Sequence, residues 1–169
     1  ANKSMLASGK LSVENGAHIV TQQFLDSFLI LSGSGITFGL VIAMLFAAKS
    51  KQYKALGKVA AFPAIFNVNE PVVFGFPIVM NPVMFLPFII VPILAAIIVY
   101  TSIAIGFMHP FSGVTLPWST PAIISGFMVG GWQGAFVQVL VLATSTVVYF
   151  PFFKFQDNLA YNNELQAEK

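Results

Sequence analysis

The chain has 169 residues, of which 57% are hydrophobic and 8% charged, with a net charge of +2. Soluble domains carry about 25% charged residues, so this composition indicates a membrane protein. The absence of cysteine excludes disulfides, thiolate metal sites and a cysteine nucleophile from this chain. Every basic residue is lysine, and the small net charge excludes a nucleic-acid-binding surface.

The first part of the chain predicts a polar lead-in followed by one membrane span. Residues 1–21 are polar and are expected to lie at the membrane interface. Phe28 to Ala48 carries no charge and would form a helix of about 31 Å, long enough to cross. Ser32-Gly33-Ser34-Gly35 lies within it and predicts either a close helix contact or a kink that lines a substrate site. The chain begins without methionine, so we expect it to be part of a longer protein.

A lysine-rich segment follows the predicted span. Lys49, Lys51, Lys54 and Lys58 predict a cytoplasmic loop over residues 49–58. The spacing from Lys51 to Lys58 also fits an amphipathic helix on the membrane surface, with its lysines toward anionic headgroups.

The stretch from Asn67 to Pro82 is the most unusual part of the sequence. It holds Glu70, after which no Asp, Glu, Lys or Arg occurs until Lys154. An acid at the bilayer centre costs about 2.5–3.5 kcal/mol, so a lone one is a functional candidate. Its prolines interrupt helices, and irregular backbone at membrane depth must be buried in protein or line a cavity. The stretch therefore predicts a kinked, re-entrant segment.

Two further spans are predicted after Glu70. The uncharged length from Pro71 to Met108 would reach about 57 Å as a straight helix, so it cannot be one span. We divide it at Asn81-Pro82 and predict a span from Val83 to Met108. The last span is predicted from Ala122 to Phe153.

The prolines of His109–Pro121 predict a second re-entrant segment between these spans. Residues 155–169 are expected to form a polar, exposed tail. The predicted fold is therefore all-α: a polytopic helical membrane protein with about three full spans, a surface helix and two re-entrant segments, in a single domain over residues 1–169.

The lysines also predict the arrangement of the broken segments. The 49–58 loop and Lys154 should share the cytoplasmic side, which requires an even number of crossings between them. The two spans in between satisfy this only if Asn67–Met80 enters the membrane and returns. Two broken segments that meet near the midplane are a common way to build a transporter's binding site.

The first broken segment contains the best candidate site residues. Glu70 can accept hydrogen bonds from sugar hydroxyls, bind a proton or bind a cation. Asn67 and Asn69 both donate and accept, as vicinal hydroxyls require. Either asparagine could instead cap the backbone around Pro71.

The second broken segment adds further candidates. Trp118 could stack on the apolar face of a sugar beside Ser119, or it could anchor the chain at the membrane interface. His109 could cap a helix end, bind a ligand or carry a proton. Two histidines without a nearby carboxylate cluster predict no metal site, and no cofactor-binding motif is present.

One long motif resembles a known family. Residues 66–82 read FNVNEPVVFGFPIVMNP. This closely resembles the signature of the membrane-spanning IIC component of bacterial sugar phosphotransferase systems, in the lactose/cellobiose/chitobiose group. Ser32–Thr37, the lysine-rich loop and Pro117–Pro121 are similar to that group in the same order.

The resemblance implies a function and roles for several residues. IIC components bind a β-linked disaccharide, present it to a phosphorylated IIB partner and release the sugar phosphate inside. By this resemblance Glu70 contacts the sugar near the hydroxyl that is phosphorylated, Asn69 lies beside it and Trp118 stacks on the sugar. The family implies a homodimer in the bacterial cytoplasmic membrane, in contact with lipid. Its members have several hundred residues, so the chain is similar to their C-terminal part, without the upstream His that works with the motif acid.

The sequence favours a sugar permease in which Glu70 orients the reacting hydroxyl and acts as a possible base. The chain would take part in a phosphotransferase complex without being a catalyst by itself. One alternative is an ion-coupled secondary transporter, in which the acid binds H⁺ or Na⁺. Another is a structural membrane segment without a ligand.

Overall fold

The computed structural model describes residues 2–8, 12–76, 78, 80–111 and 116–167, and within these ranges the regular structure is entirely helical. The elements are α1 (Asn2–Ala7), η1 (Val13–Asn15), α2 (Gln22–Phe24), η2 (Leu25–Leu29), α3 (Phe38–Ala47), α4 (Lys51–Ile65), α5 (Glu70–Gly75), α6 (Pro82–Ala104) and α7 (Ile124–Ala167). Of the predicted second broken segment, residues 112–115 lie outside this description.

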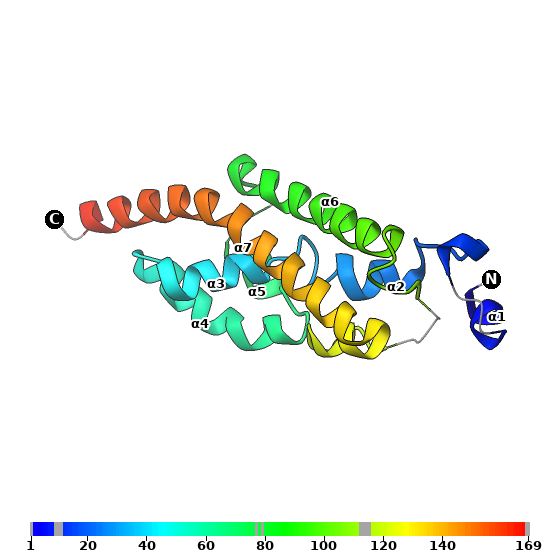
Figure 1. The fold of residues 1–169 in the computed structure, drawn as a ribbon. Coiled ribbons are helices and arrows are strands. Elements are labelled where there is room, and N and C mark those ends of the chain that lie inside the picture. Colours follow the sequence, from blue (N-terminus) through cyan, green and yellow to red (C-terminus); the bar gives the residue numbers. More distant parts are fainter. Residues whose placement is uncertain (1, 9–11, 77, 79, 112–115, 168–169) are drawn as a thin grey trace.

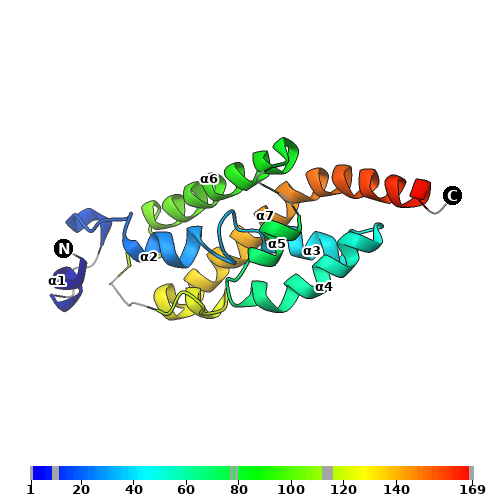
Figure 2. The same ribbon diagram turned by 180° about the vertical axis from the view of Figure 1, so that it is seen from behind.

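The long helix α7 organises the molecule (Figure 1). It packs against α3 on one side and α6 on another, and α4 packs against α3 and α5. The N-terminal segment lies at one end of the molecule and the end of α7 at the other (Figures 1 and 2). The short α5 lies in the central part, between these ends (Figure 2).

Two of the described helices, α6 and α7, are long and apolar enough to cross a membrane. α6 has 23 residues and continues through Pro87 and Pro92. It ends at Ala104, four residues before the predicted end at Met108. Gly106, two residues after the helix, has a left-handed φ of 78°. α7 has 44 residues but is interrupted at Gly130 and Gly131, the latter with φ of 64°. Its first six residues therefore form a separate short helix.

The predicted span from Phe28 to Ala48 is not one helix. η2 ends at Leu29, a series of turns follows, and α3 begins only at Phe38. The ten residues of α3 reach about 15 Å, half of the hydrocarbon thickness. The helix breaks because Ser32, Gly33 and Gly35 all adopt left-handed φ values, of 58°, 84° and 77°.

Most described residues of the predicted tail are exposed, as expected, but the segment is helical and one of its acids is buried. α7 continues to Ala167, and Asp157 within it is only 2% exposed. The Asp157 carboxylate accepts hydrogen bonds from the backbone N–H groups of Lys49 and Ser50, at 2.8 and 3.0 Å. Asp157 thus has its partners in the backbone that leads into α4, which a sequence pattern does not reveal.

The lysine-rich segment and the apolar residues after it form one helix, α4, which begins at Lys51 and contains Pro63 near its end. Ser50 caps it, since its hydroxyl accepts a hydrogen bond from the N–H of Tyr53. The Tyr53 ring stacks on Phe76 with ring centroids 4.4 Å apart, and Phe153 of α7 lies against both rings. This aromatic cluster fixes the end of the first broken segment against α4 and α7.

Candidate functional site

Asn67 joins the two irregular regions that the sequence singled out. Its side-chain oxygen accepts a hydrogen bond from the N–H of Ser32 at 2.6 Å. Its side-chain nitrogen donates to the carbonyl oxygens of Trp118 and Thr120, at 2.6 and 2.9 Å. Asn67 itself has a φ of 64°, a conformation that asparagine tolerates better than most residues. One side chain therefore holds three segments together.

Asn69 binds the same glycine-serine turn from the neighbouring position. It is 7% exposed, and its side-chain nitrogen donates to the carbonyl of Ser34 at 2.7 Å. Gly33 lies directly against it, so that a Cβ at that position would overlap the Asn69 side chain. The glycine is thus required both for its left-handed φ and for this close approach.

A row of buried polar side chains on α7 supports the turn from the other side. The Tyr149 hydroxyl donates to the carbonyl of Gly35 at 2.8 Å, and Ser145 donates to the carbonyl of Ile36. Gln138 continues the row and donates to the carbonyl of Ser27 at 2.7 Å. The spacings of seven and four residues place all three side chains on one face of the helix.

Trp118 and Thr120 lie in a tight turn beside Asn67. Both the N–H and the hydroxyl of Thr120 donate to the carbonyl of Pro117, and Ser119 is half-buried within the turn. The Trp118 side chain is 70% exposed, so its ring face is available. A small cavity lies between this turn and η2, lined by Asp26, Ser27, Leu31, Asn67, Leu116, Pro117, Trp118, Thr120 and Ser125.

This cavity has a volume of about 20 Å³. Such a volume accommodates one water molecule, and a sugar ring is several times larger. The cavity itself is therefore too small to hold a sugar ring. Asp26 is exposed at the edge of the cavity, where its carboxylate accepts hydrogen bonds from the Gln22 side chain at 2.9 and 3.0 Å.

Glu70 begins α5 directly after Asn69 and before Pro71. Its side chain is exposed, and no hydrogen bond from a described residue occupies its carboxylate. It begins a helix of six residues, and the chain before it is non-helical. The acid is thus available to a ligand, and it directly follows Asn69, whose side chain is anchored on Ser34.

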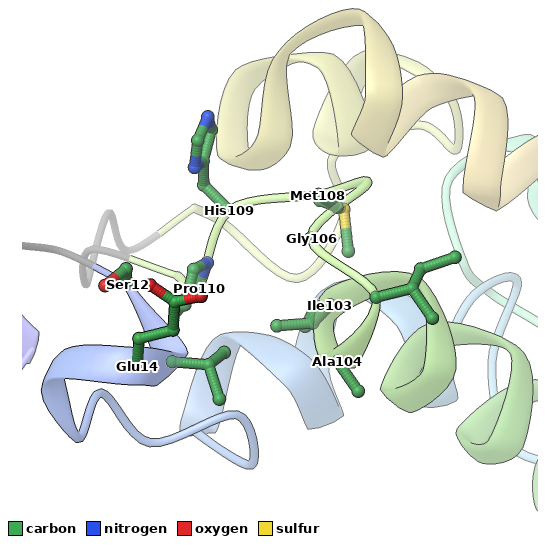
Figure 3. Close-up of a pocket in the computed structure, with 10 residues that line it drawn as sticks. Ser12, Glu14, Ile103, Ala104, Gly106, Met108, His109 and Pro110 are labelled. Carbon is green, nitrogen blue, oxygen red and sulfur yellow. The ribbon is translucent and has the colours of Figure 1, made fainter.

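His109 does not join this group. It lines a different cavity of about 310 Å³, together with Glu14, Gly106 and other residues between η1 and the end of α6. Figure 3 shows the exposed His109 ring pointing away from Glu14 and Ser12. The structure therefore brings Asn67, Asn69 and the Trp118 turn together and places His109 elsewhere. In the part of the chain described, no three His, Asp or Glu side chains gather as metal ligands.

Sequence reasoning missed Gln138, Ser145 and Tyr149. A signal for them was present, because polar residues within an apolar span face the protein interior. Their common helical face could have been found from the spacing alone. Their partners could not, since these are backbone carbonyls between Ser27 and Ile36, more than a hundred positions away.

These features define a class of protein. Beside two helices able to cross a membrane lies a polar region in which the backbone is irregular and held by the carboxamides of Asn67 and Asn69. Irregular backbone of this kind inside a membrane protein is typical of transporters.

Comparison with known proteins identifies the family. The family model described as "Phosphotransferase system, EIIC" matches residues 1–92. The chain belongs to this family, which consists of integral membrane permeases, and the resemblance seen in the sequence is confirmed.

Individual relatives match most of the chain. The lichenan permease IIC component of Bacillus subtilis (strain 168) is 45% identical over 152 residues, covering 89% of this chain and 34% of the relative. The cellobiose-specific EIIC component of Geobacillus stearothermophilus is 42% identical over 142 residues, covering 83% of this chain and 32% of the relative.

A solved structure shows the same fold. The crystal structure of ChbC, the IIC component of the N,N'-diacetylchitobiose-specific system, matches with a TM-score of 0.89 and 37% sequence identity. The match covers 96% of this chain and 37% of the ChbC chain. The chain thus spans about a third of the length of these relatives.

Proposed function

We propose that the chain is the C-terminal, substrate-binding portion of a sugar permease that takes up a β-linked disaccharide for phosphorylation by a IIB partner. The relatives named above act on lichenan, cellobiose or diacetylchitobiose, as their names state. Other relatives are named as lactose-specific EIICB components, which supports a functional link between IIC and IIB.

The observation that carries the proposal is the set of hydrogen bonds made by Asn67 and Asn69. They hold an exposed acid, Glu70, and an exposed ring, Trp118, on one polar framework. A carboxylate that accepts from sugar hydroxyls and an aromatic ring that covers the sugar's apolar face suit a disaccharide. The Glu70 carboxylate and the Trp118 ring can both be exposed in the sugar-free protein and become covered when the sugar binds.

The asparagines take different roles in this proposal. The Asn67 amide already makes three hydrogen bonds to protein, so its main role is to position the Trp118 turn. Asn69 uses one donor on Ser34 and keeps its side-chain oxygen for a sugar hydroxyl. Ser119, in the same turn as Trp118, supplies a further hydroxyl for the sugar, and His109 serves the entrance side rather than the reacting end.

The proposal includes a membrane arrangement. Residues 67–80 and 109–121 form re-entrant segments, α6 and α7 cross the bacterial cytoplasmic membrane, and the lysines of α4 face anionic lipid headgroups. The short α5 and the irregular backbone around it support the first of these segments. The intact permease forms a homodimer, as the family resemblance implies.

Substitution of Glu70 in the full-length protein tests the function. We expect Glu70→Gln to weaken disaccharide binding about tenfold and to lower phosphorylation by the IIB partner further, because a hydrogen bond to a charged group and a possible base are lost. Glu164→Gln, which changes an acid near the end of α7 that binds the start of α4, is the control. Unchanged binding and phosphorylation in Glu70→Gln and Glu70→Ala would refute the proposal that Glu70 contacts the sugar.

The nature of the transported product separates the proposal from an ion-coupled transporter. Membrane vesicles supplied with phosphoenolpyruvate and the phosphotransfer proteins should accumulate sugar phosphate. Accumulation of free sugar, driven by a proton or sodium gradient alone, would contradict the proposal.

A further inference from the structure

A buried carboxamide lies behind the turn that carries Trp118. Gln138, in the middle of α7, is 0% exposed and belongs to no cavity lining described above. Nothing in the proposed function requires it to contact a ligand. Its side chain nevertheless reaches both walls of the small cavity beside Trp118.

The oxygen of this carboxamide binds the backbone on either side of Ser125, which lines one wall. It accepts hydrogen bonds from the N–H groups of Ile123 and Gly126, at 2.5 and 3.0 Å. These groups lie at the start of the short first part of α7, where helical N–H groups have no partner within the helix. Ile123 has a φ of 71°, which is unfavourable for a β-branched residue. Gln138 therefore stabilises a strained backbone three residues after Thr120.

The nitrogen of the same carboxamide binds both walls, through Ser125 and Ser27. It donates to the carbonyl of Ser27 at 2.7 Å and to the hydroxyl of Ser125 at 2.9 Å. Ser27 belongs to η2, next to Asp26, and both residues line the cavity. A glutamine side chain offers two donors and two acceptor positions, and Gln138 uses all four.

The surrounding glycines show that this arrangement is tightly packed. A Cβ at Gly126 would overlap the Gln138 amide, and one at Gly134 would overlap the Gly126 carbonyl oxygen. The first part of α7 can therefore lie against the main helix only with glycine at both positions. Neither methionine, which has a similar length, nor glutamate, which lacks the donors, reproduces the four bonds.

We propose that Gln138 is a positioning residue for sugar recognition, which sets the distance between η2 and the Trp118 turn without contacting the sugar. The inference rests on the proposed function, since it assumes that Trp118 meets the sugar. Loss of the four bonds would let the turn move and the ring lose its orientation. The reacting end near Glu70 is held separately by Asn69 and would stay in place.

The test compares Gln138→Met with Gln133→Met in the full-length permease. Gln133 lies on the same helix, is only half-buried and makes no hydrogen bond to the residues described here. We expect Gln138→Met to raise the KM for cellobiose about tenfold with kcat changed less than about twofold, the pattern of lost binding without lost chemistry. Hydrogen exchange of residues 116–126 should become faster, while that of residues 140–153 stays the same. Gln133→Met should change none of these.

Gln138→Glu provides a second variant in case the methionine variant fails to fold. Its carboxylate retains the bonds from Ile123 and Gly126 but cannot donate to Ser27, so KM should rise by a smaller factor with the same exchange pattern. An unchanged KM in either folded variant, or an equal rise in Gln133→Met, would overturn the inference. If the wild-type permease and its IIB partner together yield no β-disaccharide phosphate, the proposed function fails instead. That result is distinguishable from a failure of the inference about Gln138.

Discussion

Two glycines with the same backbone conformation, Gly16 and Gly33, differ in what surrounds them. Both have a φ of 84°. No atom lies within 4 Å of a Cβ built on Gly16, whereas one on Gly33 overlaps the Asn69 side chain. The pair therefore separates the cost of a left-handed conformation from the cost of crowding at the proposed sugar site.

We expect Gly16→Ala to lower the free energy of unfolding by about 1–2 kcal/mol, the cost of placing an L-residue in the left-handed region. Gly33→Ala should cost about 1–3 kcal/mol more, because Asn69 must also move. Thermal unfolding of the full-length protein in detergent measures both. Equal losses in the two variants would show that Asn69 is not held against Gly33.

At the scale of elements, the start of α4 is held by two carboxylates from the end of α7. Asp157 binds the N–H groups of Lys49 and Ser50. Glu164, seven residues later, accepts from the hydroxyl of Ser50 at 2.8 Å and from the N–H groups of Lys51 and Gln52, at 3.0 and 3.1 Å. Acids stabilise a helix N-terminus by binding its free N–H groups and by interacting with the helix dipole. This contact joins the last element to the helix that leads into Asn67.

Glu164 should make this contact pH-dependent. The backbone N–H groups of Lys51 and Gln52 and the Ser50 hydroxyl lower the pKa of Glu164 from its usual value of 4.5. Because the folded-state pKa is the lower one, the stabilisation is present above pH 4.5 and is lost as the pH falls through the folded-state value. We expect Glu164→Gln to lower Tm at pH 7 and to differ progressively less from wild type below pH 4.5. A Tm difference that stays constant on acidification would contradict this assignment.

At the scale of the whole molecule, the lysine-rich start of α4 lies away from the cavity beside His109. The start of α4 contacts the end of α7, and both lie toward the same end of the molecule's long axis (Figure 1). The end of α6, which leads to His109, lies toward the opposite end (Figure 1). Clustered lysines beside membrane spans predict the cytoplasmic side, so the His109 cavity should face outward.

Single cysteines introduced into a cysteine-free, full-length protein test this orientation. A membrane-impermeant thiol reagent added to intact cells should label His109→Cys. It should label Lys54→Cys only after the cells are opened. Labelling of Lys54→Cys in intact cells would reverse the topology and remove the basis for a cytoplasmic α4.

The apolar composition and the long uncharged stretches were enough to predict a helical membrane protein, and the prolines were enough to predict that Asn67–Pro82 is not one helix. The motif in residues 66–82 was enough for the resemblance to the EIIC family, because that motif is specific. At Ser32–Gly35 the sequence predicted either a close helix contact or a kink inside one span, and it underestimated how far the helix is interrupted. The left-handed residues there in fact end one helix and delay the next until Phe38.

The sequence by itself determined the fold class, the family and the identity of the polar residues, since each of these follows from local composition and spacing. The tertiary structure alone decided what those residues bind. Asn67 reaches Ser32 and Trp118, Gln138 reaches Ser27, and Asp157 reaches Lys49, across separations of 35 to 111 positions. The physical reason is that these partners are mostly backbone N–H and carbonyl groups, which every residue possesses. Which backbone groups remain without a backbone partner, and therefore bind a side chain, depends on how the helices and turns pack together.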